Sequence, residues 1–204
     1  MRLLYTLLLY LLIPFVLLRL WWRGRRNPGY RQRAAERFGL YQRPVPEGCI
    51  WIHAVSVGES QATQPLMRWM SENLPDVPVV ISTTTPTGAD RVTQMYGDTV
   101  THIYFPYDLP FAIRRALRAF QPRLIVVMET EIWPNFMHLC KKRGTPVVLA
   151  NARLSEPSAK GYQRVRALIA PAIRSFAAIA AQNSQDAGRF VTLGADRQQV
   201  HTCG

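Results

Sequence analysis

The sequence has few cysteines, and the three that it has, Cys49, Cys140 and Cys203, lie far apart without a Cys-x-x-Cys pair. This spacing excludes a disulfide-stapled scaffold and argues against a cysteine-based zinc site. The sequence also lacks a Gly-x-Gly-x-x-Gly motif, so the dinucleotide fingerprint is absent. Hydrophobic residues make up 48% of the 204 residues, which excludes a disordered chain and allows one domain with a short appendage.

Acidic residues are scarce near the N-terminus. The first 47 residues hold nine of the 25 basic residues but only two of the 13 acidic ones. They include an apolar run, Leu3 to Trp22, with a single charge at Arg19. At ~1.5 Å per residue this run is about 30 Å long, the thickness of a bilayer core. It ends in Leu-Trp-Trp-Arg rather than in the small residues of a signal-peptide cleavage site. We therefore predict a transmembrane helix, a membrane anchor with a basic flank, at residues 1–26.

The arginines after this run predict its orientation. Seven of them lie between Arg23 and Arg43, whereas one precedes the run. Positive charge stays on the cytoplasmic side of a membrane, so the rest of the chain should face the cytoplasm. The basic stretch adjoins an apolar span, which favours a role at anionic lipid over nucleic-acid binding. Residues 27–47, which end in a proline-containing segment, are expected to be a linker.

Residues 48–204 alternate short apolar runs with longer amphipathic segments. The apolar runs, interpreted as buried parallel strands, are Ile50–Val55, Val77–Ser82, Val100–Phe105, Leu124–Met128, Val147–Ala150 and Ala177–Ala181. The expected helices are Ser60–Asn73, Thr87–Tyr96, Leu109–Phe120, Trp133–Arg143, Tyr162–Ser175 and Ser184–Leu193. Regular alternation of this kind predicts a doubly wound α/β domain with a Rossmann-like parallel sheet. Ligands of such sheets bind at the carboxyl ends of the strands.

The loop after the first predicted strand holds Ser56, Gly58 and Glu59. Gly58 should permit a tight turn, and the free N–H groups of the helix that follows favour a carboxylate or a bound anion. A plain helix start with a cap and an acidic residue explains the same pattern. Position alone does not decide between the two.

The loop after Leu124–Met128 carries two carboxylates, Glu129 and Glu131. Desolvated carboxylates at the tip of a buried strand cost free energy unless they are paired, so their presence suggests a function, with helix capping as the alternative. No His or Cys lies close in sequence to complete a metal site, so no metal is expected. His53 and His102 fall in predicted strands, and we interpret both as structural.

Two further loops are candidates for substrate binding. Thr85 and Gly88 lie in a hydroxyl-rich loop that suits a sugar or phosphate, or simply caps a helix. Asn151 and Arg153 follow the fifth predicted strand and add a cation at the same edge of the sheet.

Taken together, these loops resemble the N-terminal half of the Kdo transferases, which move 3-deoxy-manno-octulosonic acid (Kdo) from CMP-Kdo onto a lipid A precursor. The matching stretches are LLYTLLLYLL, RLWWRGRRNPGYRQRAAERFG, HAVSVGES, TTTPTGADR, YFPYDLP, VMETEIWPN, NARLSE and AAQNSQDAGRF. They follow the family order along essentially the whole chain.

The resemblance implies an inverting, metal-independent glycosyltransferase of the GT-B type at the bacterial inner membrane, in lipopolysaccharide biosynthesis. It implies Glu59 as the general base and Glu129 as a second carboxylate that stabilises the transferred sugar. It assigns Ser56, Gly58, Thr85, Gly88, Glu131, Asn151 and Arg153 to substrate binding. No cofactor is implied, because CMP-Kdo is a donor substrate. Residues 48–204 are then the acceptor-binding domain, and the CMP-sugar-binding domain is expected to lie outside this chain, which alone should be inactive.

Two other functions fit the same sequence. One is a GT-B glycosyltransferase that acts on a different lipid. The other is a non-catalytic, membrane-anchored domain that binds a lipid headgroup. A binding domain should tolerate Glu59→Gln, whereas an enzyme should lose turnover.

Overall fold

The apolar runs form a seven-stranded sheet in the computed structural model, which describes residues 1–42 and 46–203. The strand order is β3-β2-β1-β4-β5-β6-β7, and all neighbours are parallel. The strands are β1 (Ile50–His53), β2 (Val79–Thr83), β3 (Thr101–Tyr104), β4 (Leu124–Met128), β5 (Val147–Ala152), β6 (Ala178–Ala181) and β7 (Val200–Thr202). Six of them lie on the predicted runs, and the predicted α/β, Rossmann-like class is confirmed.

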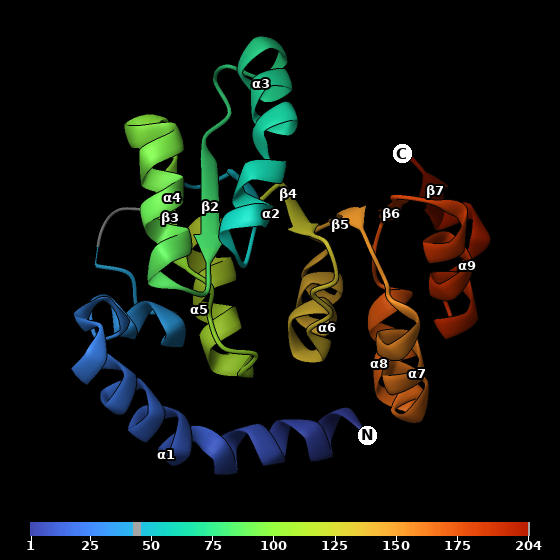
Figure 1. The fold of residues 1–204 in the computed structure, drawn as a ribbon, viewed down its shortest axis with the longest axis horizontal. Coiled ribbons are helices and arrows are strands. Elements are labelled where there is room, and N and C mark those ends of the chain that lie inside the picture. Colours follow the sequence, from blue (N-terminus) through green and yellow to red (C-terminus); the bar gives the residue numbers. More distant parts are fainter. Residues whose placement is uncertain (43–45, 204) are drawn as a thin grey trace.

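Helices connect the strands and cover both faces of the sheet (Figure 1). They are α2 (Val57–Ala62), α3 (Gln64–Asn73), α4 (Pro86–Tyr96), α5 (Pro110–Phe120), α6 (Pro134–Arg143), α7 (Glu156–Arg164), α8 (Arg166–Ile173) and α9 (Ser184–Leu193). Short 3-10 helices are η1 (Pro28–Tyr30), η2 (Ala34–Phe38), η3 (Gly97–Thr99) and η4 (Arg197–Gln199).

Two helices and one strand differ most from the prediction. The helix expected over residues 60–73 is divided at Thr63, because Pro65 lies in the first turn of α3 and cannot continue a helix. The helix expected from Tyr162 begins at Glu156 instead, where the Ser155 side chain caps the Ser158 N–H and Pro157 occupies the first turn. Strand β7 was not predicted, because this short edge strand is largely exposed and lacks an apolar run.

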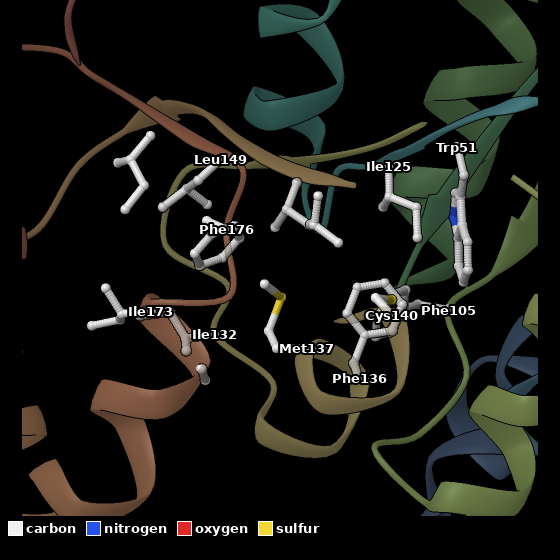
Figure 2. Close-up of a cluster of buried hydrophobic side chains, with 14 of the residues drawn as sticks. Trp51, Phe105, Ile125, Ile132, Phe136, Met137, Cys140, Leu149, Ile173 and Phe176 are labelled. Atoms are coloured by element: carbon white, nitrogen blue, oxygen red, sulfur yellow. The ribbon is translucent and has the colours of Figure 1, made fainter. Parts of the chain in front are cut away.

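Large side chains fill the space between the sheet and the helices of one face. Trp51 on β1 packs edge-on against Phe120 of α5 and Phe136 of α6, with ring centroids 5.2 and 5.6 Å apart. Figure 2 shows Trp51, Phe136 and their neighbours pointing into this layer. The Trp51 indole N–H donates to the Ser82 hydroxyl at 2.8 Å, so the one polar atom of this ring is satisfied. This core fixes the strand ends that carry the candidate site.

The apolar N-terminal run forms helix α1 (Arg2–Arg26), which is long and apolar enough to cross a membrane. It lies across one end of the domain, below α5 and α6 in Figure 1. Its first turns are bound there: Arg2 Nη1 and Thr6 Oγ1 donate to the buried Asn135 side-chain oxygen at 3.1 and 2.9 Å. Its other side is exposed and almost wholly apolar, with Leu3, Leu4, Leu7, Leu8, Leu11, Leu12, Phe15, Leu17, Leu18, Trp21 and Trp22.

The segment expected to be a linker is residues 27–47. Its first part, residues 27–42, packs on the domain. The Arg33 guanidinium binds Glu36 at 2.7 Å and donates to the His102 carbonyl of β3. The Glu36 carboxylate accepts the Tyr104 N–H at 2.9 Å. Residues 43–45 of the expected linker lie outside the described residues. Residues 27–42 are therefore attached to the edge strand β3.

Candidate functional site

The candidate site is the carboxyl edge of the sheet, where the loops after β1, β2, β4 and β5 meet. Because all strands are parallel, these loops emerge at the same end of the sheet. Helix α1 crosses this end, and a cavity of about 410 Å³ lies between it and the loops. A larger hollow of about 880 Å³ between α1, α5 and α6 is lined by none of the predicted site residues. We therefore place the candidate site at the smaller cavity.

Glu59 lies in the first turn of α2 and is almost completely buried. One carboxylate oxygen accepts the Val55 N–H at 2.9 Å, and the other accepts the Ser56 hydroxyl at 3.0 Å. Burial raises the pKa of Glu59, the hydrogen bonds from Val55 and Ser56 oppose this rise, and the charge of Glu129 adds to it. The result is a carboxylate held in one orientation, with a raised pKa that suits it to accept a proton.

Glu129 and Glu131 follow β4 directly. The Glu129 backbone has φ of +58°, in the left-handed region that a side chain like glutamate rarely adopts. Its N–H donates to the Ala150 carbonyl at 2.9 Å, so this conformation is held by the neighbouring strand. At this turn Glu59, Glu129 and Glu131 lie close enough for their charges to interact.

The half-buried Glu131 has a pKa raised to about 7. The largest cause is burial, followed by the negative charge of Glu59, while the Trp133 indole opposes the rise and Glu129 adds to it. Three carboxylates that share one site do not all ionise easily. Because its pKa lies near 7, Glu131 is partly protonated around neutral pH.

This raised pKa predicts a pH-dependent cost to stability. Below about pH 4.5 Glu131 is protonated in the folded and unfolded chain alike, and above pH 7 the folded chain bears the full cost of its charge. We expect Glu131→Gln to raise the free energy of unfolding by roughly 1–2 kcal/mol above pH 7, and to change it little at pH 4.5. Urea unfolding at both pH values measures the difference. Glu72→Gln, which removes an exposed charge from α3, is the control, and an equal effect of Glu131→Gln at both pH values would contradict the expectation.

The predicted glycine and threonine positions have mainly local roles. Thr85 Oγ1 accepts the Gly88 N–H at 3.1 Å and so caps α4, and Thr85 also lines the cavity. A Cβ on Gly88 would meet Thr85 and Thr83 at 3.1 and 3.2 Å, so the close packing favours glycine. Gly58 differs from expectation: its φ is not positive and open space surrounds it, so no tight turn requires it.

The loop after β5 is joined to its neighbours. Asn151 has φ of +53° in an irregular stretch of β5, and its side-chain oxygen accepts from Gln182 Nε2 at 2.6 Å. The Arg153 carbonyl accepts the Thr130 hydroxyl, so the β4 and β5 loops form one connected edge. The Arg153 side chain is exposed. Ser56 and Arg153 are exposed, but the Ser56 hydroxyl is bonded to Glu59 and the Asn151 amide to Gln182.

Of the two histidines interpreted as structural, His53 is fully buried and His102 is half-buried, and both contact neighbouring side chains. His53 stacks on Phe105 at 3.8 Å, its Nδ1 lies 3.0 Å from the Ser82 hydroxyl, and burial lowers its pKa to about 3. His102 lies between Arg33 and Thr83, and its pKa is also lowered to about 3, by burial and by nearby arginines. Among residues 1–42 and 46–203, no cluster of three His, Cys, Asp or Glu side chains is arranged to hold a metal ion.

Several charged residues of the cavity were not predicted as site residues, among them the buried Arg37 and Asp108. The Asp108 carboxylate accepts the N–H groups of Asn135 and Phe136 at the start of α6, at 3.0 and 2.7 Å. Burial raises its pKa to about 7 in spite of these bonds. Asp108 precedes the Leu-Pro start of α5, which was a possible signal in the sequence. Its carboxylate, however, caps α6 and not α5. Arg37 had no local signal at all.

Comparison with known proteins adds a family and a fold. Residues 32–204 match the family model described as 3-deoxy-D-manno-octulosonic-acid transferase (kdotransferase). A 3-deoxy-D-manno-octulosonic acid transferase of Haemophilus influenzae is 42% identical over 100% of this chain and 48% of its own length. One of Bordetella pertussis is 33% identical over 96% of this chain and 47% of its own length. The chain thus spans about half the length of the curated relatives it matches.

Solved structures share the fold at low identity. The UDP-GlcNAc 2-epimerase of Neisseria meningitidis, solved with UDP-GlcNAc bound, superimposes with a TM-score of 0.56 at 12% identity. The match covers 76% of this chain and 46% of the epimerase. This likeness supports the sheet architecture predicted for the N-terminal domain of a GT-B protein.

Proposed function

Since the chain belongs to the Kdo transferase family, we propose that it is the acceptor-binding half of an enzyme that transfers Kdo from CMP-Kdo to a lipid A precursor in lipopolysaccharide biosynthesis. The observation that supports this most is the burial of Glu59 with both of its oxygens held by Val55 and Ser56. Ser56 also caps α2 by accepting the Glu59 N–H, so these hydrogen bonds serve the helix start as well. A helix cap requires neither burial of the carboxylate nor a raised pKa, whereas both suit a base that must meet a substrate hydroxyl in one orientation.

In the proposed reaction Glu59 removes the proton from a hydroxyl of the glucosamine disaccharide as that oxygen attacks Kdo. The new bond joins this oxygen to the anomeric carbon of Kdo, the bond from that carbon to the CMP phosphate oxygen breaks, and CMP leaves with the bonding electrons. Attack opposite the leaving group inverts the sugar. Positive charge develops on the sugar ring as CMP departs, as in glycoside chemistry, and Glu129 faces this charge as a second carboxylate.

Substrate binding is divided between the edge loops. Ser56, Gly58, Thr85, Gly88, Glu131, Asn151 and Arg153 are proposed to contact the sugars. A second domain, supplied by the rest of the protein, is proposed to hold CMP, and the scheme uses no metal or cofactor. A nucleotide sugar held from one side only would lose the positioning on which transfer depends.

The location proposed for the enzyme is the cytoplasmic face of the bacterial inner membrane. Exposed leucines and tryptophans give α1 an apolar outer side, and Arg25 and Arg26 stack on Trp21 and Trp22 at 4.1 and 4.9 Å. Aromatic and basic side chains of this kind belong at a membrane interface. Because α1 crosses the carboxyl edge of the sheet, the lipid contacted by α1 and the carboxylates lie at the same end of the domain.

The 204-residue chain alone is expected to bind the lipid A precursor and to transfer no sugar. A completed chain, in which the C-terminal half of the Haemophilus influenzae relative follows Gly204, is expected to transfer Kdo. Incubation of each with CMP-Kdo and labelled precursor, followed by separation of the products, measures transfer. Product from the 204-residue chain above that of its Glu59→Gln variant would contradict the division of labour. A correctly folded completed chain without product would contradict the proposed function.

A further inference from the structure

Arg37 is a buried cation without an anionic partner. Its exposed fraction is 4%, and the adjacent carboxylate, Glu36, is bound by Arg33 instead. Its Nη2 donates to the Thr84 carbonyl at 3.0 Å, and its guanidinium lies 4.3 Å from the centre of the Tyr104 ring. Its Nε is buried and has no hydrogen-bond partner among the described residues. Such a group costs free energy, because a buried charge needs a counter-charge.

The cavity beside Arg37 contains two more arginines. Arg19 and Arg23 reach it from α1, and Arg23 lies 5.1 Å from the centre of the Tyr30 ring, which lines the same cavity. The Tyr107 hydroxyl senses the charges of both Arg37 and Arg19, both of which lower its pKa against the effect of burial. Three cations from two separate segments of the chain thus line one cavity.

The carboxyl groups of this cavity leave these arginines free. Asp108 is engaged by the N–H groups at the start of α6, and Glu131 lies with Glu59 and Glu129. Within residues 1–42 and 46–203, Arg19, Arg23 and Arg37 form no salt bridge. The positive charge is therefore available to a ligand.

We propose that Arg37, Arg19 and Arg23 form an anion-binding subsite that takes a phosphate group of the lipid acceptor. The guanidinium fork matches two oxygens of a phosphate, and a volume of about 410 Å³ is enough for a phosphorylated sugar. Thr85 and Glu131 line the same cavity, so a phosphate held there positions the attached sugar toward the carboxylates. The assignment of the phosphate to the acceptor rests on the proposed function.

The test compares two lipids on the 204-residue chain in neutral detergent. One is the lipid A precursor with its phosphate groups, and the other is the same lipid after phosphatase treatment. We expect the phosphorylated lipid to bind roughly ten- to a hundredfold more tightly, the range for a charged hydrogen-bonded contact. Arg37→Gln should abolish this preference. Arg37→Lys should keep part of it, because the charge remains while the fork is lost.

Arg19→Gln and Arg26→Gln complete the set. Arg19 is exposed on α1, so its replacement leaves the core intact and should still reduce the preference severalfold. Arg26, which lies on the same helix and does not line the cavity, is the matched control and should leave it unchanged. If Arg37→Gln does not fold, as judged by thermal unfolding, Arg19→Gln decides.

Equal binding of the two lipids by the unaltered chain would overturn the subsite, and transfer of Kdo by the completed chain would still uphold the proposed function. A preference that survives both Arg37→Gln and Arg19→Gln would also overturn it. Two competition experiments distinguish the possible sources of the phosphate group. One uses inorganic phosphate as the competitor, and the other compares vesicles of phosphatidylglycerol with vesicles of phosphatidylcholine. Binding of inorganic phosphate or phosphatidylglycerol without binding of either test lipid would overturn the assignment to the acceptor.

Discussion

Replacing Glu59 with glutamine in the completed chain is expected to lower kcat by roughly two to four orders of magnitude, the range for loss of one general base. Glutamine keeps the size of the side chain and can still accept the Val55 N–H, so the start of α2 should remain intact. The acceptor should bind as before, since the charge that is lost serves the proton transfer. Kinetics at saturating substrate, with lipid binding measured in parallel, separate these two effects.

The same base predicts how the rate depends on pH. Because burial raises the pKa of Glu59, the rate should fall as the pH falls through that raised value, where the protonated carboxyl can no longer accept a proton. Glu72→Gln removes a carboxylate from the exposed side of α3 and should leave kcat unchanged. A Glu59→Gln enzyme with nearly the original kcat would assign the base to another group.

Deletion of residues 1–26 is expected to release the protein from membranes without unfolding the domain. Helix α1 contributes a single buried residue, Gly24, so the core loses almost nothing. Helix α1, in contrast, carries most of the exposed large hydrophobic side chains found in residues 1–42 and 46–203. Fractionation at high salt should move the shortened chain wholly into the soluble fraction, and circular dichroism should show a folded domain.

The matched variant for this deletion keeps the helix and removes charge. Arg25→Gln with Arg26→Gln should remain in the membrane pellet at high salt, because salt weakens ionic contacts and not apolar insertion. A shortened chain that stays in the pellet would show that α1 is not the main anchor. An unfolded shortened chain would show that the contacts of Arg2 and Thr6 with Asn135 hold the domain together.

The fold followed from the sequence because buried parallel strands appear as apolar runs. Ile50–His53 and Leu124–Met128 lie inside their predicted ranges for this reason. The position of α1 relative to the sheet could not be predicted in the same way. Nothing in the first turn of α1 indicates that Arg2 binds Asn135, 133 residues further along the chain.

The candidate site, too, could be predicted only in part. The parallel arrangement alone brings the loops of Glu59, Glu129 and Glu131 to one edge, and the structure places them within range of each other. Arg37 was missed because its significance depends on Glu36 being bound by Arg33 and on α1 lying opposite. A local pattern of two neighbouring opposite charges reads as an exposed pair, and only packing shows which arginine has no partner.

With Glu129 as the proposed second carboxylate, its backbone conformation sets stability against activity. Strands β4 and β5 are both followed closely by a left-handed residue, Glu129 and Asn151. Asparagine adopts this conformation readily, whereas glutamate does so at a cost of about 1–2 kcal/mol. Selection for thermal tolerance alone would therefore retain Asn151 and replace Glu129 with glycine or asparagine. Retention of glutamate at this turn is therefore expected only where the proposed function of its carboxylate is under selection.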